Sequence, residues 1–375
     1  MINVLYVNNE DRTVGGATLS LMNLMHSVRE EVRPTVLLRE DGVVGNFLRS
    51  EGYEVIVIPF QRGTFNGSIW KKVFRTLPHL LNVLVSRRKT VRRALTLLKD
   101  RDIRLVHSNS GTVDIGLYIA RALGVPHLWH LREYMDLDFG QRPFLGFRRF
   151  GKKLLSSEGV LAISSGIFEH FSLENHPCAR WINDAVRPAS DRLKSSEKEK
   201  YFLFSASLFS PAKQPETAVL AFCLSGVFRS GYRLRLTGHC SDEMKESLTS
   251  IAASYGASEY LDFVDFTADI KSQMERASGF LMTSRSEGLG RVTVEAMFYG
   301  CPVIARRSGG SLDILEDGRT GILFSTTEEC AEAIRSLSER FPSEMVEAAG
   351  DVAVERFSEE AYGPKIMDFY KTLLG

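Results

Sequence analysis

The chain has 375 residues, of which 44% are hydrophobic and 25% are charged. This composition is that of a soluble globular protein and excludes a disordered one, and the length suggests two hydrophobic cores. The formal net charge is +1, but residues 1–186 hold 25 basic and 18 acidic residues, whereas the rest holds 22 and 28. The positive first half predicts an anionic partner: nucleic acid, lipid headgroups or a phosphorylated substrate.

The cysteines and the first residues of the chain bear on the cellular compartment. The five cysteines are widely spaced and have no paired ligand spacing, so neither a disulfide framework nor a zinc site is indicated. The first residues, MINVLYVNNEDR, lack a basic leader and an apolar run of signal-peptide length, and no run of 18 apolar residues occurs. We expect a cytoplasmic protein that does not span a membrane.

Short apolar runs that predict buried strands alternate with longer amphipathic stretches that predict helices. In the first half the predicted strands are INVLYV (2–7), RPTVLL (33–38), YEVIVIPF (53–60), IRLVHS (103–108), PHLWHL (126–131) and GVLAIS (159–164). This alternation is typical of a parallel sheet with helices on both faces. Ligands of such sheets bind in the loops beyond the carboxyl ends of the strands.

The first of these loops carries two glycines. In NNEDRTVGGATLSLMNLM, Gly15 and Gly16 end the turn, and Thr18 or Ser20 is predicted to begin the helix. Paired glycines let a ligand approach the main chain, and a helix N-terminus favours an anion. A tight turn alone would also explain them, because the full G-x-G-x-x-G fingerprint is absent.

Two basic stretches follow. Residues 62–104 hold 12 basic and two acidic residues and include SIWKKVFRTLPHLLNVLV, a predicted amphipathic helix that Pro78 should kink or divide. Residues 142–155, RPFLGFRRFGKKLL, add five basic residues and no acid. The apolar helix face could simply pack on the sheet, but both clusters together favour an anionic membrane surface. No nucleic-acid module is recognisable.

The second half repeats the strand and helix pattern. The segment RPASDRLKSSEKEKY is predicted to be an exposed linker. Beyond it the predicted strands are YFLFSAS, YRLRLTG, YLDFVDF, GFLMTS, PVIAR and GILFS, and the last stretch is helical. We predict an α/β protein of two doubly wound domains, with boundaries at 1–186 (first domain), 187–200 (linker), 201–355 (second domain) and 356–375 (final helix).

One loop of the second half could carry chemistry. In SRSEGLGRVTVEAMFYG, Gly288 and Gly290 would expose main-chain N–H groups at a helix N-terminus, where a phosphate binds. Glu287 would face whatever the phosphate carries, and Glu295 could accept hydrogen bonds from a vicinal diol such as a ribose. Alternatively, both are solvated surface charges.

The stretch from Ser284 through GGSLDILEDGRTGILF resembles the C-terminal signature of glycosyltransferase family 4, the retaining GT-B enzymes. The E-G-[FL]-G loop, a second glutamate eight residues on, "EAM..G.PVIA", "GG" and "DG.TG.L" occur in order over about 40 residues. The GG loop, NDAVRP and the RFS helix extend the likeness more weakly. The resemblance implies two Rossmann-like domains that face a cleft, with the last helix crossing back to the first domain.

The same resemblance implies roles for single residues. Glu295 would bind the ribose of a nucleotide sugar, and Glu287 the hydroxyls of the transferred sugar. The main chain of Gly288, Leu289, Gly290 and Arg291 would meet the phosphates, together with Lys213.

One position departs from the family pattern. Leu208 stands where the family has a second phosphate-binding residue, an arginine. Arg285, Arg291 or Arg306 could compensate, or donor binding could be altered.

A histidine completes the implied site. His130, in PHLWHLREY, lies at a strand end where the family presents a histidine to the donor sugar. His127 is the competing candidate, a lone histidine is more often structural, and Arg132 and Glu133 could form a salt bridge.

The resemblance implies metal-free, retaining transfer of a hexose-type sugar from a UDP- or GDP-linked donor to a glycan or lipid-linked acceptor. No cofactor is expected, and the D-x-D strings at 100–102 and 136–138 are short enough to arise by chance. Surface polysaccharide assembly at the inner face of the plasma membrane would fit the basic clusters. The alternatives are a GT-B nucleotide-sugar epimerase, a phosphorylase, and an inactive sugar-nucleotide-binding subunit that supports a partner enzyme.

Overall fold

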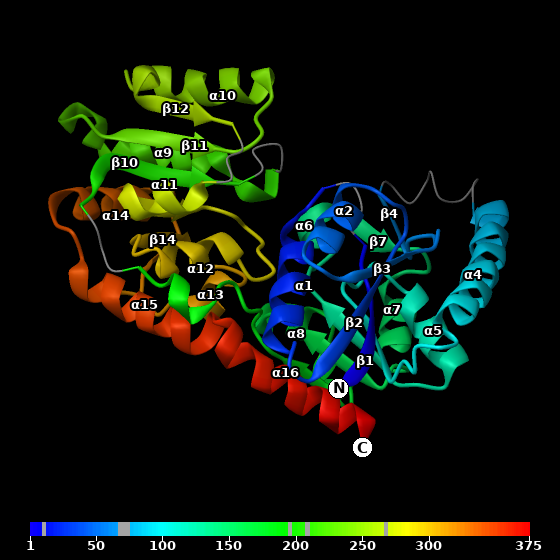
Figure 1. Cartoon of the computed structure of the whole chain (residues 1–375). Coiled ribbons are helices and arrows are strands. Elements are labelled where there is room, and N and C mark those ends of the chain that lie inside the picture. Colours follow the sequence, from blue (N-terminus) through cyan, green and yellow to red (C-terminus); the bar gives the residue numbers. More distant parts are fainter. Residues whose placement is uncertain (10–12, 67–75, 194–196, 207–210, 266–268) are drawn as a thin grey trace. The chain divides into compact units, whose positions relative to one another are not determined.

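In the computed structural model, the chain forms two compact units (Figure 1). The first unit comprises Met1–Ala185 and Tyr362–Gly375, and the second comprises Val186–Ala361. The structure describes residues 1–9, 13–66, 76–193, 197–206, 211–265 and 269–375, with the main chain alone described for 66, 76–84 and 211. Each unit is built on one parallel sheet, so the predicted α/β class is confirmed.

The first unit holds a seven-stranded parallel sheet in the order β3-β2-β1-β5-β6-β8-β9. Its strands are β1 (Ile2–Val7), β2 (Val32–Leu38), β3 (Glu54–Val57), β5 (Leu105–Ser108), β6 (His127–Leu131), β8 (Gly159–Ala162) and β9 (Ala179–Trp181). Six of them fall on predicted apolar runs, whereas the edge strand β9 is too short and polar to give that signal. A small antiparallel pair joins β4 (Thr64–Asn66) to β7 (Gln141–Pro143).

Helices cover both faces of this sheet, which explains why its strands read as unbroken apolar runs. One apolar cluster joins the sheet to α1 (Gly16–Ser27), α2 (Val43–Ser50) and α16 (Glu359–Leu374). A second joins it to α4 (Thr76–Leu98) and α5 (Ile115–Leu123). Further α-helices in the described part of this unit are α6 (Asp136–Phe139), α7 (Phe147–Leu154) and α8 (Ser165–His170).

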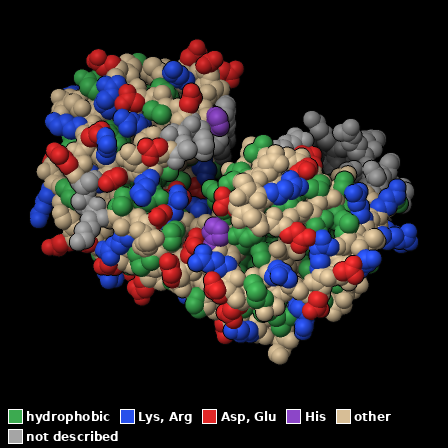
Figure 2. All heavy atoms as spheres, viewed as in Figure 1, with side chains coloured by type: hydrophobic (Ala, Val, Ile, Leu, Met, Phe, Trp, Pro, Cys, Tyr) green, Lys and Arg blue, Asp and Glu red, His purple; other side chains and the backbone are tan. Residues whose placement is uncertain are grey.

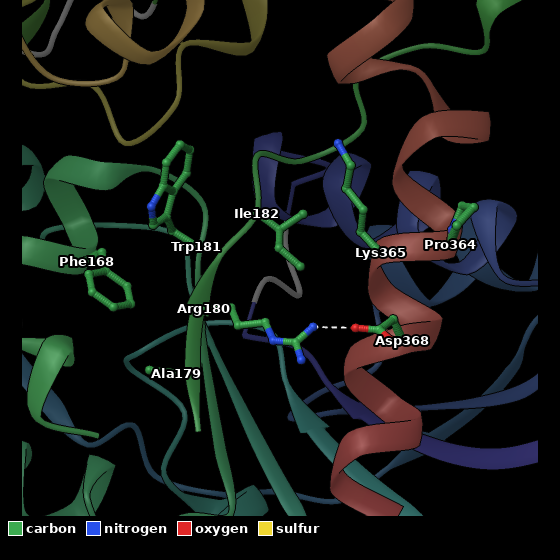
Figure 3. A pocket seen from close by; sticks show the side chains of 8 residues that line it. All are labelled: Phe168, Ala179, Arg180, Trp181, Ile182, Pro364, Lys365 and Asp368. Atoms are coloured by element: carbon green, nitrogen blue, oxygen red, sulfur yellow. Dashed lines mark hydrogen bonds and ion pairs between the residues drawn. The ribbon is translucent and has the colours of Figure 1, made fainter. Parts of the chain in front are cut away.

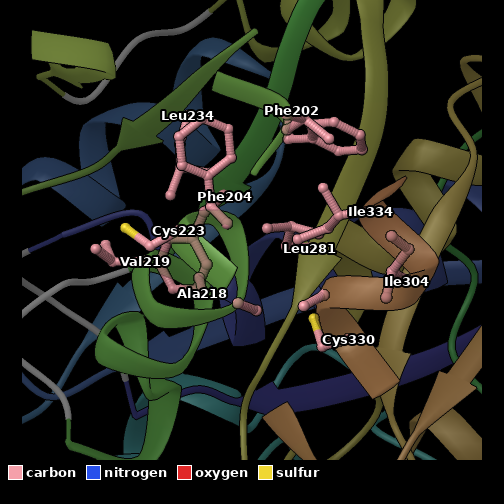
Figure 4. Packing of buried hydrophobic residues seen from close by; sticks show 14 of the residues in the cluster. Phe202, Phe204, Ala218, Val219, Cys223, Leu234, Leu281, Ile304, Cys330 and Ile334 are labelled. Carbon is pink, nitrogen blue, oxygen red and sulfur yellow. The ribbon is translucent and has the colours of Figure 1, made fainter. Parts of the chain in front are cut away.

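The second unit holds a six-stranded parallel sheet in the order β12-β11-β10-β13-β14-β15. Its strands are β10 (Glu199–Ser205), β11 (Arg233–Thr237), β12 (Leu261–Val264), β13 (Ala277–Met282), β14 (Val303–Arg306) and β15 (Ile322–Phe324). Its α-helices are α9 (Pro215–Ser225), α10 (Asp242–Ala253), α11 (Ile270–Arg276), α12 (Arg291–Phe298), α13 (Ser311–Ile314), α14 (Thr327–Glu339) and α15 (Ser343–Phe357). Figure 4 shows side chains of α9 and α14 packed against β10, β11, β13 and β14.

One helix start differs from the prediction: the helix after the first strand begins at Gly16 rather than at Thr18 or Ser20. Pro78 lies near the first of the described residues of α4. Residues 67–75, with Trp70, Lys71 and Lys72, lie outside the described residues.

The segment predicted to be a linker makes contacts within the second unit. Leu193 N donates to Phe298 O at 2.8 Å, and Arg187 pairs in an isolated bridge with Ser358. At the other end of this unit the chain continues through α16, whose residues from Tyr362 onward belong to the first unit. Within the described residues, no helix is both long and apolar enough to cross a bilayer.

Candidate active site

The loop between β13 and α12 is fixed to the turn that precedes α9. Thr283 Oγ1 lies 2.9 Å from Lys213 O and 2.8 Å from Gln214 O, and Arg285 N donates to Ala212 O at 2.9 Å. Gln214 adopts a left-handed conformation with φ 54°, which a non-glycine residue holds only when its surroundings enforce it. Two loops far apart in sequence are thus held together at the carboxyl ends of β10 and β13.

This arrangement pairs two residues that the sequence predicts to be functional. Lys213 Nζ donates to Glu287 Oε1, and Ser284 Oγ donates to the same oxygen at 2.9 Å. The Lys213 side chain is 27% exposed and that of Glu287 is 14% exposed, so both are held yet accessible. Ser284 was not predicted to take part, because a serine in a loop gives no signal of its own.

Two glycines close the other side of the same loop. Gly310 N donates to Glu287 O at 3.0 Å, and a Cβ atom at Gly310 would lie 2.2 Å from Leu289 O. At Gly309, φ is 54° and a Cβ atom would lie 2.8 Å from Glu287 O. The two chain segments therefore touch main chain to main chain, and only glycine fits there.

The helix that follows, α12, begins at Arg291, and its N-cap residue is Gly290, whose φ is 95° and which gives no side-chain cap. The first N–H groups of α12 therefore have no side-chain acceptor at the N-cap, and the positive end of the helix lies beside Glu287. Gly288, Leu289 and Gly290 lead into this helix end, and Leu289 and Gly290 are buried.

Glu295 is buried within α12 rather than being a surface charge of the helix. Its Oε1 accepts from Arg187 Nη2 at 3.2 Å and lies 4.0 Å from Arg291 Nη2. Arg291 Nη2 also donates to Val186 O at 3.4 Å. Sequence spacing could not reveal Arg187, because it lies more than a hundred residues before its partner.

Two further cations lie near the Lys213 loop. Arg306 Nε donates to Thr283 O at 3.0 Å, and burial together with the neighbouring Arg285 charge lowers the Arg306 pKa. Two guanidinium groups near each other favour a bound anion that offsets their repulsion. Leu208 lies outside the described residues.

In the first unit, the paired glycines lie where α1 begins. Gly15 is its N-cap residue without a side-chain cap, and Gly16 is exposed. Behind them, Asn109 Nδ2 donates to Asn8 Oδ1 and to Ala17 O, both at 3.0 Å.

His127 is the first residue of β6 and His130 lies near its carboxyl end, and both side chains are fully buried. His130 Nδ1 lies 3.1 Å from Arg132 Nη2 and 3.1 Å from His107 Nε2, while His127 Nε2 lies 2.9 Å from Ser108 Oγ. Burial lowers the pKa of His127 to about 3 and, together with the Arg132 charge, that of His130 well below its ordinary value. Both imidazoles are neutral near pH 7.

The salt-bridge partner of Arg132 is Asp184 rather than Glu133. Glu133 is 8% exposed, and Ser110 Oγ donates to its Oε1 at 2.5 Å. Burial raises the pKa of Glu133 to about 7 and also raises the pKa of Asp138. Arg132 therefore pairs with Asp184, whereas Glu133 accepts a hydrogen bond from Ser110.

The two D-x-D strings have structural contacts. Asp136 Oδ1 lies 3.1 Å from His170 Nε2, and Tyr134 N donates to Asp138 Oδ2 at 2.9 Å. Asp100 is exposed, and its Oδ2 lies 3.8 Å from Lys99 Nζ. Among the described residues, no group of three or more His, Cys, Asp or Glu side chains is placed to hold a metal ion.

The two basic stretches meet in the first unit. Arg87 of α4 and Lys153 of α7 both bond to Asp114 Oδ2, at 3.2 and 2.6 Å, and both lie over the ring of Tyr118. Around this junction, which we call the basic surface, the exposed basic side chains are Arg88, Lys89, Arg92, Arg93, Arg148, Arg149 and Lys152. Figure 2 shows Lys and Arg side chains gathered over α4.

A separate hollow of about 680 Å³ lies on the first unit between β9 and α16 (Figure 3). Arg180 and Asp368 pair across it at 2.5 Å. The rest of its lining is Phe168, Ala179, Trp181, Ile182, Pro364 and Lys365. None of the predicted site residues lies in this hollow.

Comparison with known proteins relates these features to a family. Residues 187–351 match the model of the "Glycosyl transferases group 1" family. The chain is 26% identical to D-inositol 3-phosphate glycosyltransferase of an Arthrobacter species over 66% of this chain and 64% of that protein. It is 29% identical to the lipopolysaccharide core biosynthesis glycosyltransferase LpsE of Rhizobium meliloti over 35% of this chain and 39% of that protein. The chain thus spans less than two thirds of these relatives.

Solved structures match over nearly the whole chain. The crystal structure of Anabaena HepE in complex with UDP has a TM-score of 0.80 at 20% identity and covers 99% of this chain and 100% of that chain. The apo form of the lipopolysaccharide outer core galactosyltransferase WaaB has a TM-score of 0.72 at 16% identity and covers 99% of both chains. At these identities the likeness shows a common fold.

Proposed function

We propose that this chain, which belongs to the glycosyl transferases group 1 by its residues 187–351, moves a hexose-type sugar from a nucleotide-sugar donor to an acceptor hydroxyl with retention of configuration. The observation that carries the proposal is the Lys213–Glu287 pair at the ends of β10 and β13. Departure of a nucleoside diphosphate needs a cation at the phosphates, and recognition of a sugar needs a carboxylate at its hydroxyls. Both groups lie on one anchored loop pair.

In this proposal, Lys213 moves from Glu287 to the donor phosphates when the donor binds. Glu287 then exchanges its lysine partner for hydroxyls of the sugar and keeps the hydrogen bond from Ser284. The phosphates also approach the N-terminus of α12, where the helix dipole favours negative charge. Arg285 and Arg306 provide further positive charge, which is one way to compensate for Leu208.

Glu295 is proposed to hold the ribose. Its hydrogen bond from Arg187 holds the carboxylate in place before the nucleotide arrives. HepE was solved with UDP and with UDP-glucose, which supports a uridine donor for this chain over a guanosine donor. No metal is required in the proposed reaction, because lysine, arginine and the helix end supply the positive charge.

The first test is ligand-induced stabilisation. A nucleotide that binds only the folded protein, at about 100 times its Kd, adds about 2.7 kcal/mol to the free energy of unfolding. We expect UDP and UDP-sugars to raise the melting temperature in the presence of EDTA, and GDP and ADP to raise it less. Stabilisation that requires a divalent ion would contradict the metal-free reaction.

The products distinguish the enzyme classes. A retaining transferase gives a glycoside with the donor's anomeric configuration, whereas an epimerase converts the nucleotide sugar into its epimer without an acceptor. Stabilisation by UDP-sugars without turnover of any acceptor would favour the binding-subunit alternative.

The basic surface is proposed to contact anionic lipid, which places the enzyme at the inner face of the membrane and its acceptor on a lipid or a nascent surface glycan. The exposed Leu145 and Leu155 adjoin the exposed arginines and lysine of α7. Apolar groups beside cations suit the interface between headgroups and acyl chains. The relatives named for lipopolysaccharide synthesis support a surface polysaccharide.

Charge reversal of α7 tests the membrane contact. Each basic residue near an anionic surface contributes about 1 kcal/mol, so replacing Arg148, Arg149 and Lys152 by glutamate is expected to weaken binding to phosphatidylglycerol vesicles by about 100-fold or more. Flotation or sedimentation measures this. A triple glutamate variant at the exposed Arg229, Lys245 and Arg340 of the second unit matches the charge change and should retain binding. Equal loss in both variants would refute a specific surface.

A further inference from the structure

A chain of hydrogen bonds runs from α16 to His130 through buried side chains of the first unit. Tyr6 OH lies 3.0 Å from Tyr370 OH, and Tyr370 OH lies 2.7 Å from His107 Nδ1. His107 Nε2 lies 3.1 Å from His130 Nδ1. All four side chains are fully buried, so these groups bond to one another rather than to solvent water. The sequence predicts a role for only one of them.

The direction of every bond in this chain follows from one residue. Arg132 Nη2 lies 3.1 Å from His130 Nδ1, and a guanidinium group can only donate. His130 Nδ1 must therefore accept. Burial and the Arg132 charge lower the pKa values of His130 and His107 well below the ordinary value, so each imidazole carries one proton. The proton of His130 is thus on Nε2.

The same reasoning extends outward. Because His130 Nδ1 has no proton, His107 must donate from Nε2, and its Nδ1 must accept from Tyr370. The Tyr370 oxygen then accepts from Tyr6. Four side chains from β1, β5, β6 and α16 thus form one directed chain, in which the single lone pair of His130 Nδ1 is shared by Arg132 and His107.

At the His130 end of this hydrogen-bond chain, one donor has no acceptor. His130 Nε2 is buried and makes no hydrogen bond within the described part of the chain; Asp184 Oδ1 lies 3.6 Å away, beyond hydrogen-bond reach. Both Asp184 oxygens already accept, Oδ1 from Tyr362 OH at 3.2 Å and Oδ2 from Arg132. A buried donor without a partner is costly and points to a partner that arrives later.

We propose that His130 is held as a hydrogen-bond donor through Nε2, and that Tyr370 of α16 and His107 are the positioning residues that hold it so. This inference rests on the proposed function for the identity of the acceptor, an oxygen of the bound nucleotide sugar. Its tautomers can be measured without any substrate. His130 in this state cannot take a proton at Nε2, so it orients the substrate and does not act as a base.

The test compares two tyrosines of one helix. Tyr370→Phe removes the donor to His107 Nδ1, whereas Tyr362→Phe removes a buried hydroxyl that bonds to Asp184. Multiple-bond proton–nitrogen spectra of histidine-labelled full-length protein report which ring nitrogen carries the proton. We expect His107 and His130 to be Nε2-protonated from pH 6 to 8 in the wild type and in Tyr362→Phe. In Tyr370→Phe, His107 should become a mixture of tautomers.

Stability and turnover complete the comparison. Tyr370→Phe loses two buried hydrogen bonds and Tyr362→Phe loses one, so both melting temperatures should fall, with the larger fall in Tyr370→Phe. Only Tyr370→Phe should also lower kcat, by about tenfold. A proton on Nδ1 of His130, or a Tyr370→Phe spectrum identical to that of the wild type, would overturn the proposal. If the tautomers are as expected but His130→Ala keeps full activity, the positioning chain stands and the role of His130 in the proposed function fails.

Discussion

Replacing Lys213 by alanine is expected to lower kcat about 100- to 1,000-fold, the usual consequence of removing one group that stabilises charge in a transition state. The variant loses the cation that meets the leaving diphosphate. It also leaves Glu287 with Ser284 as its remaining hydrogen-bond donor among the contacts described above. Steady-state kinetics with a saturating donor separate this loss from weaker binding, because the effect should fall mainly on kcat rather than on KM.

The control for this variant is Lys200→Ala. Lys200 lies near the amino end of β10, whereas the Lys213 loop follows the carboxyl end of that strand, and Lys200 Nζ donates to Ser230 O at 3.2 Å. Lys200→Ala removes the same kind of side chain from the same unit as Lys213→Ala. We expect kcat and KM of this control variant to be nearly unchanged. Equal rates for wild type and Lys213→Ala would remove Lys213 from the site and, with it, the main support for the proposed function.

Gly310→Ala should damage the site as strongly without altering any charged group. The new methyl group would overlap the main chain of Leu289, which cannot rotate away as a side chain can. Such overpacking costs about 1 to 3 kcal/mol in free energy of unfolding. The loop that carries Glu287 must shift, and a displacement of about 1 Å can lower the rate about 100-fold. Melting temperature and kcat should therefore fall together.

Gly151→Ala is the matched control for that substitution. Gly151 lies inside α7, and nothing lies within 4 Å of a Cβ atom built there. Alanine is favoured over glycine in a helix by about 1 kcal/mol, so this variant should be slightly more stable and equally active. A Gly310→Ala protein with wild-type kcat would show that the contact between the two loops does not set the geometry of Glu287.

The local features of the fold could be predicted because each of them depends on a short stretch of sequence. The apolar runs of β1 and β13 give a period that any buried strand gives, and Gly290 and Gly300 mark the ends of α12. The strand β9 could not be predicted, since three residues of mixed polarity carry no period.

The site divides in the same way. Glu287, Glu295 and the glycines between them belong to one continuous motif, so the sequence alone is enough to recognise them. Arg187, which pairs with Glu295, and His107, which contacts His130, are brought in by strand order and helix packing. No pattern in the sequence around Arg187 or His107 indicates which residue it contacts. Only the tertiary structure shows that Arg132 joins Asp184 instead of the adjacent Glu133.

The first unit is assembled from two pieces of chain that are synthesised at different times. Tyr362, Ile366, Phe369 and Tyr370 complete the apolar cluster on one face of its sheet. A ribosome that has made residues 1–185 has therefore released a sheet with one face partly uncovered, and the whole second unit must be translated before the covering helix appears. The unit that emerges first is the last to be completed. Until then, its exposed face is a natural target for chaperones.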